Sequence, residues 1–480
     1  MTESPSRPRD GAQLTRRAML GVLGAGAVGY AVFGPRPSKE RSDGRLVLDY
    51  WEKWTQNEAA AMKVVVDRFN ASQDRLFVRY FSVSPIDQKA MIAIAGGDPP
   101  DILGLGNFSI PAYAESGAIL PLDEYAKKAG IERGAYAPAA WRMCLHPAGS
   151  EGVPRLYGII VTNGSLALFY NRALFREVGL DPDQPPRTIS ELDAANRKLM
   201  LFKDSGAPGG VTTQDDGERD LARVGYIHTE PNWWTWHFGY SFGGTILDEA
   251  HDKATADSPE NIRAYEWVQS YPRGLSRKDQ KNTLRLVRFQ TGLGKYGTAD
   301  NPFLTGKIAM TYQGPWLANV IHEYHPDLDY GVAPFPVEDS LYDPDRPIGL
   351  LDGDVLTIPT GAKHPEASFE FIAYTQRPEN LEFLASAHGK NSPLVKVSPD
   401  FEKGHVNKYV GVHAKIANSP RAFIFPRTRT WQEYVSEWNA AFGALWQMQI
   451  GVPEALERVR AADQRHLDRA AEARRKRGGS

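Results

Sequence analysis

The 480-residue sequence is poor in cysteine, in excess charge of either sign and in long apolar segments, and each shortage excludes a class of protein. Its single cysteine, Cys144, cannot form an intramolecular disulfide or a cysteine-rich metal site, so a packing role is expected. With 56 Lys and Arg against 58 Asp and Glu, the net charge of −2 is too even to draw the protein onto nucleic acid. The balance of 42% hydrophobic and 24% charged residues indicates a folded, soluble body.

Signatures of common catalytic, cofactor and metal sites are also missing. No HExxH motif and no Cys-His arrangement occurs. Residues 24–29 match the dinucleotide pattern GxGxxG, but Pro35 and Pro37 prevent the helix that such a site needs. His322 and His325 are three residues apart, and a polar helix end explains them better than a metal site, because only two aspartates could complete the ligand set. We therefore expect no cofactor, no metal and no enzyme activity.

The first 44 residues have the order of an export signal and spacer. Arg16 and Arg17 precede an uncharged stretch, rich in Gly and Ala, that extends to Phe33. This order is typical of a basic segment followed by an apolar one, and the paired arginines resemble a twin-arginine signal. The stretch is shorter than the roughly 20 residues that span a bilayer. The body is expected in the periplasm or otherwise outside the cytoplasm, and an uncleaved N-terminal anchor remains open.

From residue 46 onward, strand and helix patterns alternate. Apolar runs at 46–50, 76–81 and 102–105 predict strands, and helices are predicted between them, one with Met62, Val65, Val66 and Phe69 on one face. This β-α-β-α-β series predicts an α/β fold with a parallel sheet, whose ligands bind beyond the carboxyl ends of the strands. Later strands are predicted at 156–161, 165–170, 330–335 and 355–358, and helices at 171–178, 188–202, 365–375 and 453–475.

An ordered set of short motifs resembles the extracellular solute-binding proteins of ABC transporters, in particular the sugar-binding group that includes maltose- and trehalose-binding proteins. The resemblance covers roughly residues 45–465 and follows the order of the family. The matching segments are Tyr50-Trp51-Glu52, Phe69-Asn70, Gly96 to Ile102, Ser116 to Leu122, Tyr157-Gly158, Phe169 to Arg172, Gly179-Leu180, Pro185 to Thr188, Phe242 to Gly244, Gly306 to Met310, Gly314 to Trp316 and Ile358-Pro359.

This resemblance implies a two-lobed periplasmic-binding-protein fold with three hinge crossings, near residues 158–163, 329–336 and 374–378. Lobe one would comprise 45–160 plus 334–376, and lobe two 161–333 plus 377–470. Residues 471–480 would form a solvated basic tail. The implied function is that of a monomer that closes on a sugar or oligosaccharide and presents it to ABC transporter permease subunits.

A sugar site combines aromatic side chains, which cover the C–H faces of the rings, with polar groups that bond the hydroxyls. Three tryptophans fall within four positions, and on a strand they cannot all point the same way. Trp431, Trp438 and Phe442 are spaced by seven and four residues, as core residues on one face of a helix are. From strand ends and from the resemblance, the candidates are Glu52, Trp54, Asn107, Asn163, Trp233, Trp234, Trp236, Trp316, Asp352, Asp354 and Trp431.

Two alternatives remain open at this stage. A secreted carbohydrate-active enzyme would need an acid and base pair, for which Asp352 with Asp354 or Glu52 is available. The same fold could instead bind a glycerophosphodiester, a polyamine or a peptide, and Arg427 and Arg429 beside Trp431 keep an anionic ligand open.

Overall fold

The computed structural model describes residues 43–83, 85–147, 153–275 and 284–478. The predicted export signal and the GxGxxG run lie outside these residues. By its contacts the chain divides into two compact units, Met1–Val47 and Leu48–Ser480. In the first unit only residues 43–47 are described, and they include the start of strand β1. The second unit contains the rest of β1, the other strands of the first large sheet and the whole of the second.

The first sheet contains the predicted alternating segments. Its strand order is β16-β15-β3-β1-β2, and β6 also pairs with β15. β1 and β3 are parallel, with Tyr50 opposite Ile102, whereas β15 is antiparallel to β3, with Asp354 opposite Gly106. The predicted parallel arrangement therefore holds for β1 and β3, whereas β15 and β16 run in the opposite direction. The bounds are β1 Leu46–Glu52, β2 Leu76–Ser82, β3 Ile102–Gly106, β6 Ile159–Ser165, β15 Gly349–Thr357 and β16 Ala422–Ile424.

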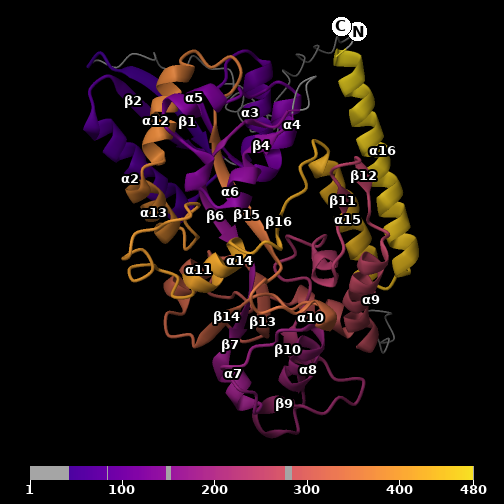
Figure 1. Ribbon diagram of the computed structural model, residues 1–480. Helices are drawn as coiled ribbons and strands as arrows, with labels where there is room; N and C mark the ends of the chain where they lie inside the picture. The colour runs from indigo at the N-terminus through magenta and orange to yellow at the C-terminus, as the bar shows by residue number, and fades with distance from the viewer. Residues whose placement is uncertain (1–42, 84, 148–152, 276–283, 479–480) are drawn as a thin grey trace, which may run out of the picture. The chain divides into compact units, whose positions relative to one another are not determined.

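Helices from distant parts of the sequence cover this sheet. The apolar face of α2 is buried, and its Phe69 ring meets the ring of Phe371 in α12 at 5.2 Å between centroids. Figure 1 shows α12 and α13 beside α2, although the three are far apart in sequence. The helices linked to this sheet are α2 Gln56–Ser72, α3 Ile86–Ala95, α4 Ile110–Glu115, α5 Asp123–Lys128, α6 Pro138–Met143, α12 Pro365–Thr375, α13 Pro378–Ala387 and α14 Val410–Ala417.

The second sheet has the order β14-β7-β13-β10-β8-β9. β10 and β13 are parallel, and β7 lies antiparallel between β13 and β14. Its strands are β7 Ala167–Asn171, β8 Leu201–Lys203, β9 Val211–Thr212, β10 Leu221–Tyr226, β13 Ile308–Gln313 and β14 Tyr330–Ala333, with α7 Arg172–Glu177, α8 Ile189–Leu199, α10 Arg285–Thr291 and α11 Leu317–Tyr324 nearby in sequence. Two short pairs complete the strands, β4 Leu145–His146 with β5 Arg155–Leu156, and β11 Leu247–Asp248 with β12 Lys253–Ala254.

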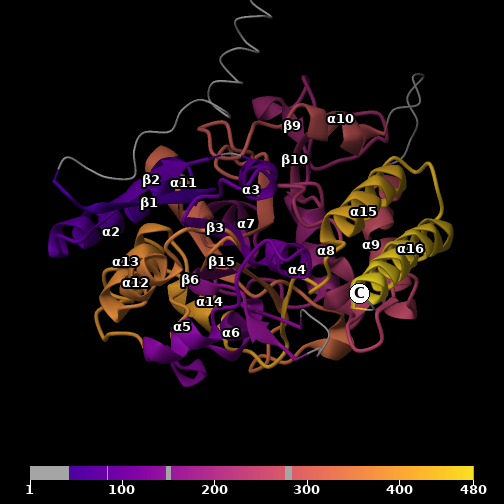
Figure 2. The same ribbon diagram turned by 90° about the horizontal axis from the view of Figure 1, so that it is seen from above.

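Three helices of the second half pack together. α15 (Trp431–Trp446) and α16 (Val452–Gly478) contact each other and α9 (Pro259–Gly274), as Figures 1 and 2 show from two directions. The predicted basic tail is not separate from this layer, because α16 continues through Gly478. Arg474 in its last turns is exposed and pairs with Asp252 at 3.1 Å.

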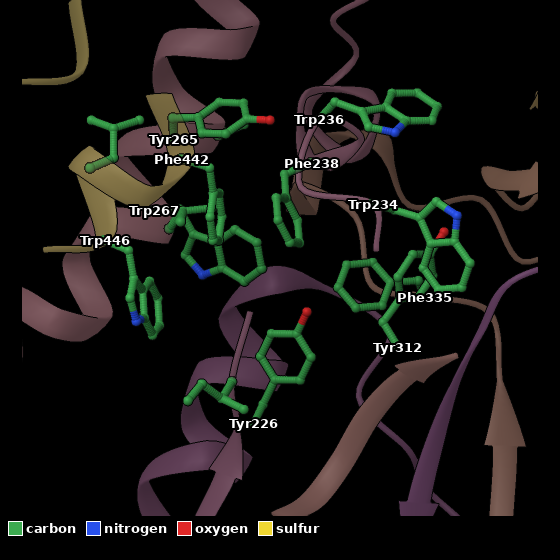
Figure 3. Packing of buried hydrophobic residues seen from close by; sticks show 14 of the residues in the cluster. Tyr226, Trp234, Trp236, Phe238, Tyr265, Trp267, Tyr312, Phe335, Phe442 and Trp446 are labelled. Carbon is green, nitrogen blue, oxygen red and sulfur yellow. The ribbon is translucent and has the colours of Figure 1, made fainter. Parts of the chain in front are cut away.

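Aromatic rings form the core between these helices and the second sheet. Figure 3 shows Trp267 of α9 close to Phe238 and Phe442, with Trp446 beside them. The Phe238 and Trp267 rings meet edge to face at 6.0 Å, and Phe442 stacks on Trp446 at 6.0 Å. Each such pair contributes about 0.5–1.5 kcal/mol beyond the burial of its area. This core supports the neighbouring segment 230–237, which contains three of the nominated tryptophans.

Predicted and observed bounds differ where a short strand follows another element. The helix predicted at 188–202 ends at Leu199, and residues 201–203 form β8, because Phe202 is buried in the strand that pairs with β10. The strand predicted at 156–161 is divided into β5 and β6. The strand predicted at 355–358 is the end of the longer β15. Among the described residues, no helix combines the length and apolar character needed to cross a membrane.

Candidate functional site

The site begins at the carboxyl end of β1. Glu52, the last residue of the strand, is 1% exposed, and its carboxylate accepts hydrogen bonds from the Tyr50 hydroxyl at 2.5 Å and the Lys53 backbone N–H at 2.7 Å. Burial, which outweighs the nearby positive charge of Lys53, raises the pKa of Glu52 to about 7. Glu52 thus faces the protein interior. Trp54, two residues on, packs edge-on against the ring of His388 at 4.5 Å.

Asp354 on β15 is the most highly bonded carboxylate of the site. It accepts hydrogen bonds from the Thr162 hydroxyl at 2.7 Å, from the Lys390 ammonium at 2.8 Å and from the Lys53 ammonium. Although burial opposes its charge, the Lys390 and Lys53 cations hold the pKa of Asp354 below its ordinary value. This group is a fixed anion that joins β1, β6 and the segment after α13.

The neighbouring nominated polar residues position the backbone. The Asn107 side chain accepts a hydrogen bond from the Gly353 backbone N–H at 3.1 Å and so holds β15 beside the end of β3. Asn163 in β6 accepts a hydrogen bond from the Asn391 backbone N–H at 2.9 Å through its own carbonyl. Burial and then the charge of Asp354 raise the pKa of Asp352 to about 6. These contacts place Asn107, Asn163 and Asp352 around Asp354 without requiring a ligand.

At the centre of the site, Lys390 is enclosed by two carboxylates and two indole rings. Its ammonium lies 2.8 Å from the Asp354 carboxylate and 3.0 Å from that of Glu58. It is also 5.7 Å from the ring centre of Trp54 and 5.5 Å from that of Trp316, within the range of cation–π attraction. The Lys390 side chain is 6% exposed. We call Lys390, Asp354, Glu58, Trp54 and Trp316 the lysine box.

The charges of the lysine box are mutually stabilised. Burial alone would lower the pKa of Lys390, but Asp354 and then Glu58 raise it above its ordinary value. Burial likewise opposes the charge of Glu58, and the Lys390 cation lowers the pKa of that carboxyl. At neutral pH the Lys390 cation therefore faces the ionised carboxylates of Asp354 and Glu58.

The local chain path places Lys390 beside Trp316. Gly389 has φ +69°, and a Cβ there would lie 3.1 Å from the carbonyl oxygen of Pro315, so glycine permits both the backbone conformation and the close approach. The Asn407 amide donates to the carbonyls of Pro315 at 3.4 Å and Gly389 at 3.3 Å. The segment after α13 is therefore joined to the turn after β13.

Aromatic rings continue from Trp316 to the surface. The distance between ring centres is 6.0 Å from Trp316 to Trp234 and 5.3 Å from Trp234 to Trp233. The ring centres of Trp233 and Tyr296 are 4.8 Å apart. Trp234 is 9% exposed and Trp233 is 44% exposed. We call Trp316, Trp234, Trp233 and Tyr296 the aromatic row. It offers indole and phenol rings on one side of the lysine box.

The structure places Trp236 and Trp431 away from this row, in the aromatic core. Trp236 is fully buried and Trp431 is 4% exposed, and their rings meet edge to face at 5.0 Å. Both also contact Phe425. Trp431 is buried because, as the first residue of α15, it lies on the same apolar face of the helix as Trp438 and Phe442.

Besides Lys53, which directly follows the nominated Glu52, the sequence interpretation missed three charged residues of the site. Lys390 follows a helix and Glu58 occupies the first turn of α2, positions at which a charged side chain is ordinarily solvated. Glu230 lines a small cavity with Trp233 and Trp234, and burial raises the pKa of its carboxyl to about 7. The position of Glu230 just before the tryptophan cluster could have indicated its place in the site, whereas nothing in the sequence distinguishes Lys390 or Glu58.

Arg427 and Arg429, which suggested an anionic ligand, both lie near carboxylates of the protein itself. Arg427 pairs with Glu249 at 2.8 Å. Arg429 lies 3.8 Å from Glu115, which also contacts Arg474 at 3.7 Å. Of the carboxyls available for an acid and base pair, Asp354 has a pKa lowered by two lysines, whereas burial raises the pKa of Asp352 and of Glu52. The arrangement fits a ligand with flat apolar faces and a polar rim.

The fold and this arrangement define a two-lobed α/β binding protein. The sequence profile of the family described as bacterial extracellular solute-binding protein matches residues 53–382, more than half of the 480 residues. The chain therefore belongs to that family, and the resemblance seen in its motifs is confirmed.

Individual relatives are distant but cover most of the chain. A maltotriose-binding protein of Pyrococcus abyssi is 21% identical over 432 residues, 89% of this chain and 80% of the relative. A periplasmic sn-glycerol-3-phosphate-binding protein of Shigella flexneri is 22% identical, over 88% of this chain and 91% of its own length. Among solved structures, CpMnBP1 with mannobiose bound has a TM-score of 0.70 at 24% identity, covering 87% of this chain and 99% of that one.

Proposed function

We propose that this protein is the extracytoplasmic substrate-binding component of an ABC importer and that it binds a sugar or oligosaccharide without chemical turnover. The observation that carries this proposal is the convergence of Trp54, which follows a strand of the first sheet, and Trp316, which follows a strand of the second, on one set of charged groups. Aromatic faces beside polar groups are what sugar rings require.

The relatives favour the same ligand class. The names of the maltotriose-binding protein and of the mannobiose-bound structure specify oligosaccharides, whereas the remaining relative is named for glycerol 3-phosphate. In this chain Arg427 is paired with a carboxylate and Asp354 and Glu58 neutralise the central lysine, so an anionic group finds little compensation. An uncharged saccharide is the better match.

The proposed mechanism is closure of two lobes on the ligand. The predicted lobes, 45–160 plus 334–376 and 161–333 plus 377–470, would each contribute one side of the cleft, with Trp54 on one and the aromatic row on the other. Binding on one lobe followed by closure would expel water and complete the hydrogen bonds. The closed form would then be recognised by permease subunits, with the protein exported by its twin-arginine-type signal.

The test is a binding titration of the protein with maltotriose, mannobiose and their monosaccharides, followed by tryptophan fluorescence and by the melting temperature. A ligand that binds only the folded state raises the melting temperature as its concentration exceeds the dissociation constant. We expect a saturable response to one saccharide class and no change in the saccharide after incubation. Glycerol 3-phosphate and spermidine serve as the charged comparison ligands.

Variants of Trp316 connect the response to the site. Trp316→Ala removes a stacking face and should weaken binding about tenfold or more, since about 1.4 kcal/mol corresponds to a factor of ten, whereas Trp316→Phe should recover part of the loss. Trp141→Phe, in α6 and outside both the aromatic row and the lysine box, is the matched control and should bind normally. If every saccharide is silent while a charged ligand raises the melting temperature, the sugar proposal is refuted. Release of a shortened sugar would refute the absence of turnover.

A further inference from the structure

The lysine box holds the Lys390 ammonium in the way that binding proteins hold an alkylammonium ligand. Two carboxylates lie at 2.8 and 3.0 Å, and two indole faces at 5.7 and 5.5 Å. Aromatic rings beside carboxylates form the usual environment for recognising an organic cation. Here the cation is supplied by the chain itself, and its side chain is 6% exposed.

Removing this ammonium from the box would leave Glu58 without its cation and Asp354 with the cation of Lys53 alone. The side chain of Asp354 is 6% exposed and that of Glu58 is 29% exposed, so both carboxylates would lose a cation in a poorly solvated position. A buried charge deprived of its partner is strongly unfavourable. Only a ligand with its own cation could replace Lys390, and it would compete with a group that is already attached.

An uncharged ligand leaves the box intact. It can contact the outer side of Trp316 and the rest of the aromatic row while Lys390 remains bonded to Asp354 and Glu58. A lysine ammonium has three N–H donors, and the two carboxylates use two of them, which leaves one for a ligand oxygen. The box thereby acts as one wall of the sugar site.

We propose that Lys390 determines ligand specificity: its ammonium permanently fills the cation position between Trp54 and Trp316, so that the cleft selects a saccharide without charged groups. The saccharide part rests on the proposed function. The box itself can be tested with no sugar present, so the two can fail separately.

The first experiment is chemical rescue in the full-length protein. Lys390→Ala creates a space of the shape of an alkylammonium ion, and we expect a lower melting temperature that n-butylammonium raises again in a saturable manner. Lys390→Met fills the same space without a charge, so n-butylammonium should not raise its melting temperature. Lys408→Ala is the matched control, because Lys408 also lies over aromatic rings, Tyr330 at 4.6 Å, but is exposed. The wild-type protein should not respond.

The second experiment compares ligands at the wild-type site, which requires no variant to fold. A bound saccharide should lose at least tenfold in affinity when one hydroxyl is replaced by an amine or a phosphate. In Lys390→Ala the affinity of the amine analogue relative to its parent should rise at least tenfold, because the empty box accepts the amine.

Three results would overturn the proposal: failure of n-butylammonium to raise the melting temperature of folded Lys390→Ala, an equal rise in Lys390→Met, or wild-type binding of the charged analogues within threefold of the parent sugar. If no saccharide binds but rescue succeeds with the expected selectivity, the filled box stands and the sugar assignment fails.

Discussion

Asp463 allows a quantitative test of how burial of a carboxyl group affects the stability of this protein. It lies on α16 against α15 and is fully buried. Burial, followed by the nearby charge of Glu437, raises the pKa of Asp463 to about 8, and a favourable contact with Trp438 offsets only part of this. The perturbation is Asp463→Asn, which keeps the shape of the side chain and removes its charge.

The size of the effect follows from the pKa difference between the folded and unfolded states. A carboxyl with a higher pKa when folded binds protons more tightly in that state, so stability is greatest below the unfolded pKa near 3.9 and falls as pH rises toward about 8. At roughly 1.36 kcal/mol per pKa unit, the penalty at pH 7 is at most about 4 kcal/mol. Relaxation of the helix pair reduces it, and we expect Asp463→Asn to stabilise the protein by about 2–4 kcal/mol at pH 7–8.

The assay is urea unfolding of the wild-type protein and Asp463→Asn between pH 5 and pH 9. The stability difference should widen steadily as pH rises and become constant above about pH 8. Asp468→Asn, an exposed position on the same helix, is the control and should change stability by less than about 0.5 kcal/mol at every pH. A difference that does not vary with pH, or a less stable Asp463→Asn at pH 8, would refute the reasoning.

Two further predictions concern the site. Asp354→Asn should destabilise the protein by about 3–5 kcal/mol, measured by urea unfolding, because it leaves the buried Lys390 and the partly buried Lys53 without their shared carboxylate; an effect below about 1 kcal/mol would contradict the central role of this residue. Gly104→Ala places a Cβ 1.7 Å from the buried Glu52 carboxylate and should cost about 1–3 kcal/mol. Gly134→Ala meets nothing within 4 Å and should be nearly neutral, so equal losses in the two alanine variants would contradict the steric argument.

Much of the first sheet could be predicted because its signals are local. The bounds of α12 agree with the predicted 365–375, and α3 lies between the second and third strands as predicted, since apolar spacing and an initial proline depend only on neighbouring residues. The placement of β15 between β3 and β6 could not be predicted in this way. Its partners lie roughly 190 and 250 residues earlier, and a strand carries little information about which distant strand it will join.

The residues of the site likewise divide into those that local sequence signals predict and those that depend on distant partners. The rule that ligands lie beyond strand ends predicts the regions of Glu52 and Asn107, which the structure brings to Asp354. The lysine box was not predictable, because a lysine after a helix resembles any solvated lysine until its partners are known. Glu58 is 332 residues away from it in the sequence. Only the folded chain reveals that these charges neutralise each other.

The position of β15 in the first sheet determines when that sheet can form during synthesis of the chain. β3 is formed from residues 102–106, yet the strand that pairs with its free edge is not available until residue 357 has been synthesised. A growing chain therefore exposes that edge during translation of some 250 residues, and such edges invite pairing with other chains. Completion of the sheet must follow nearly complete synthesis, so the folding of this protein is expected to be slow and to depend on protection of the nascent chain.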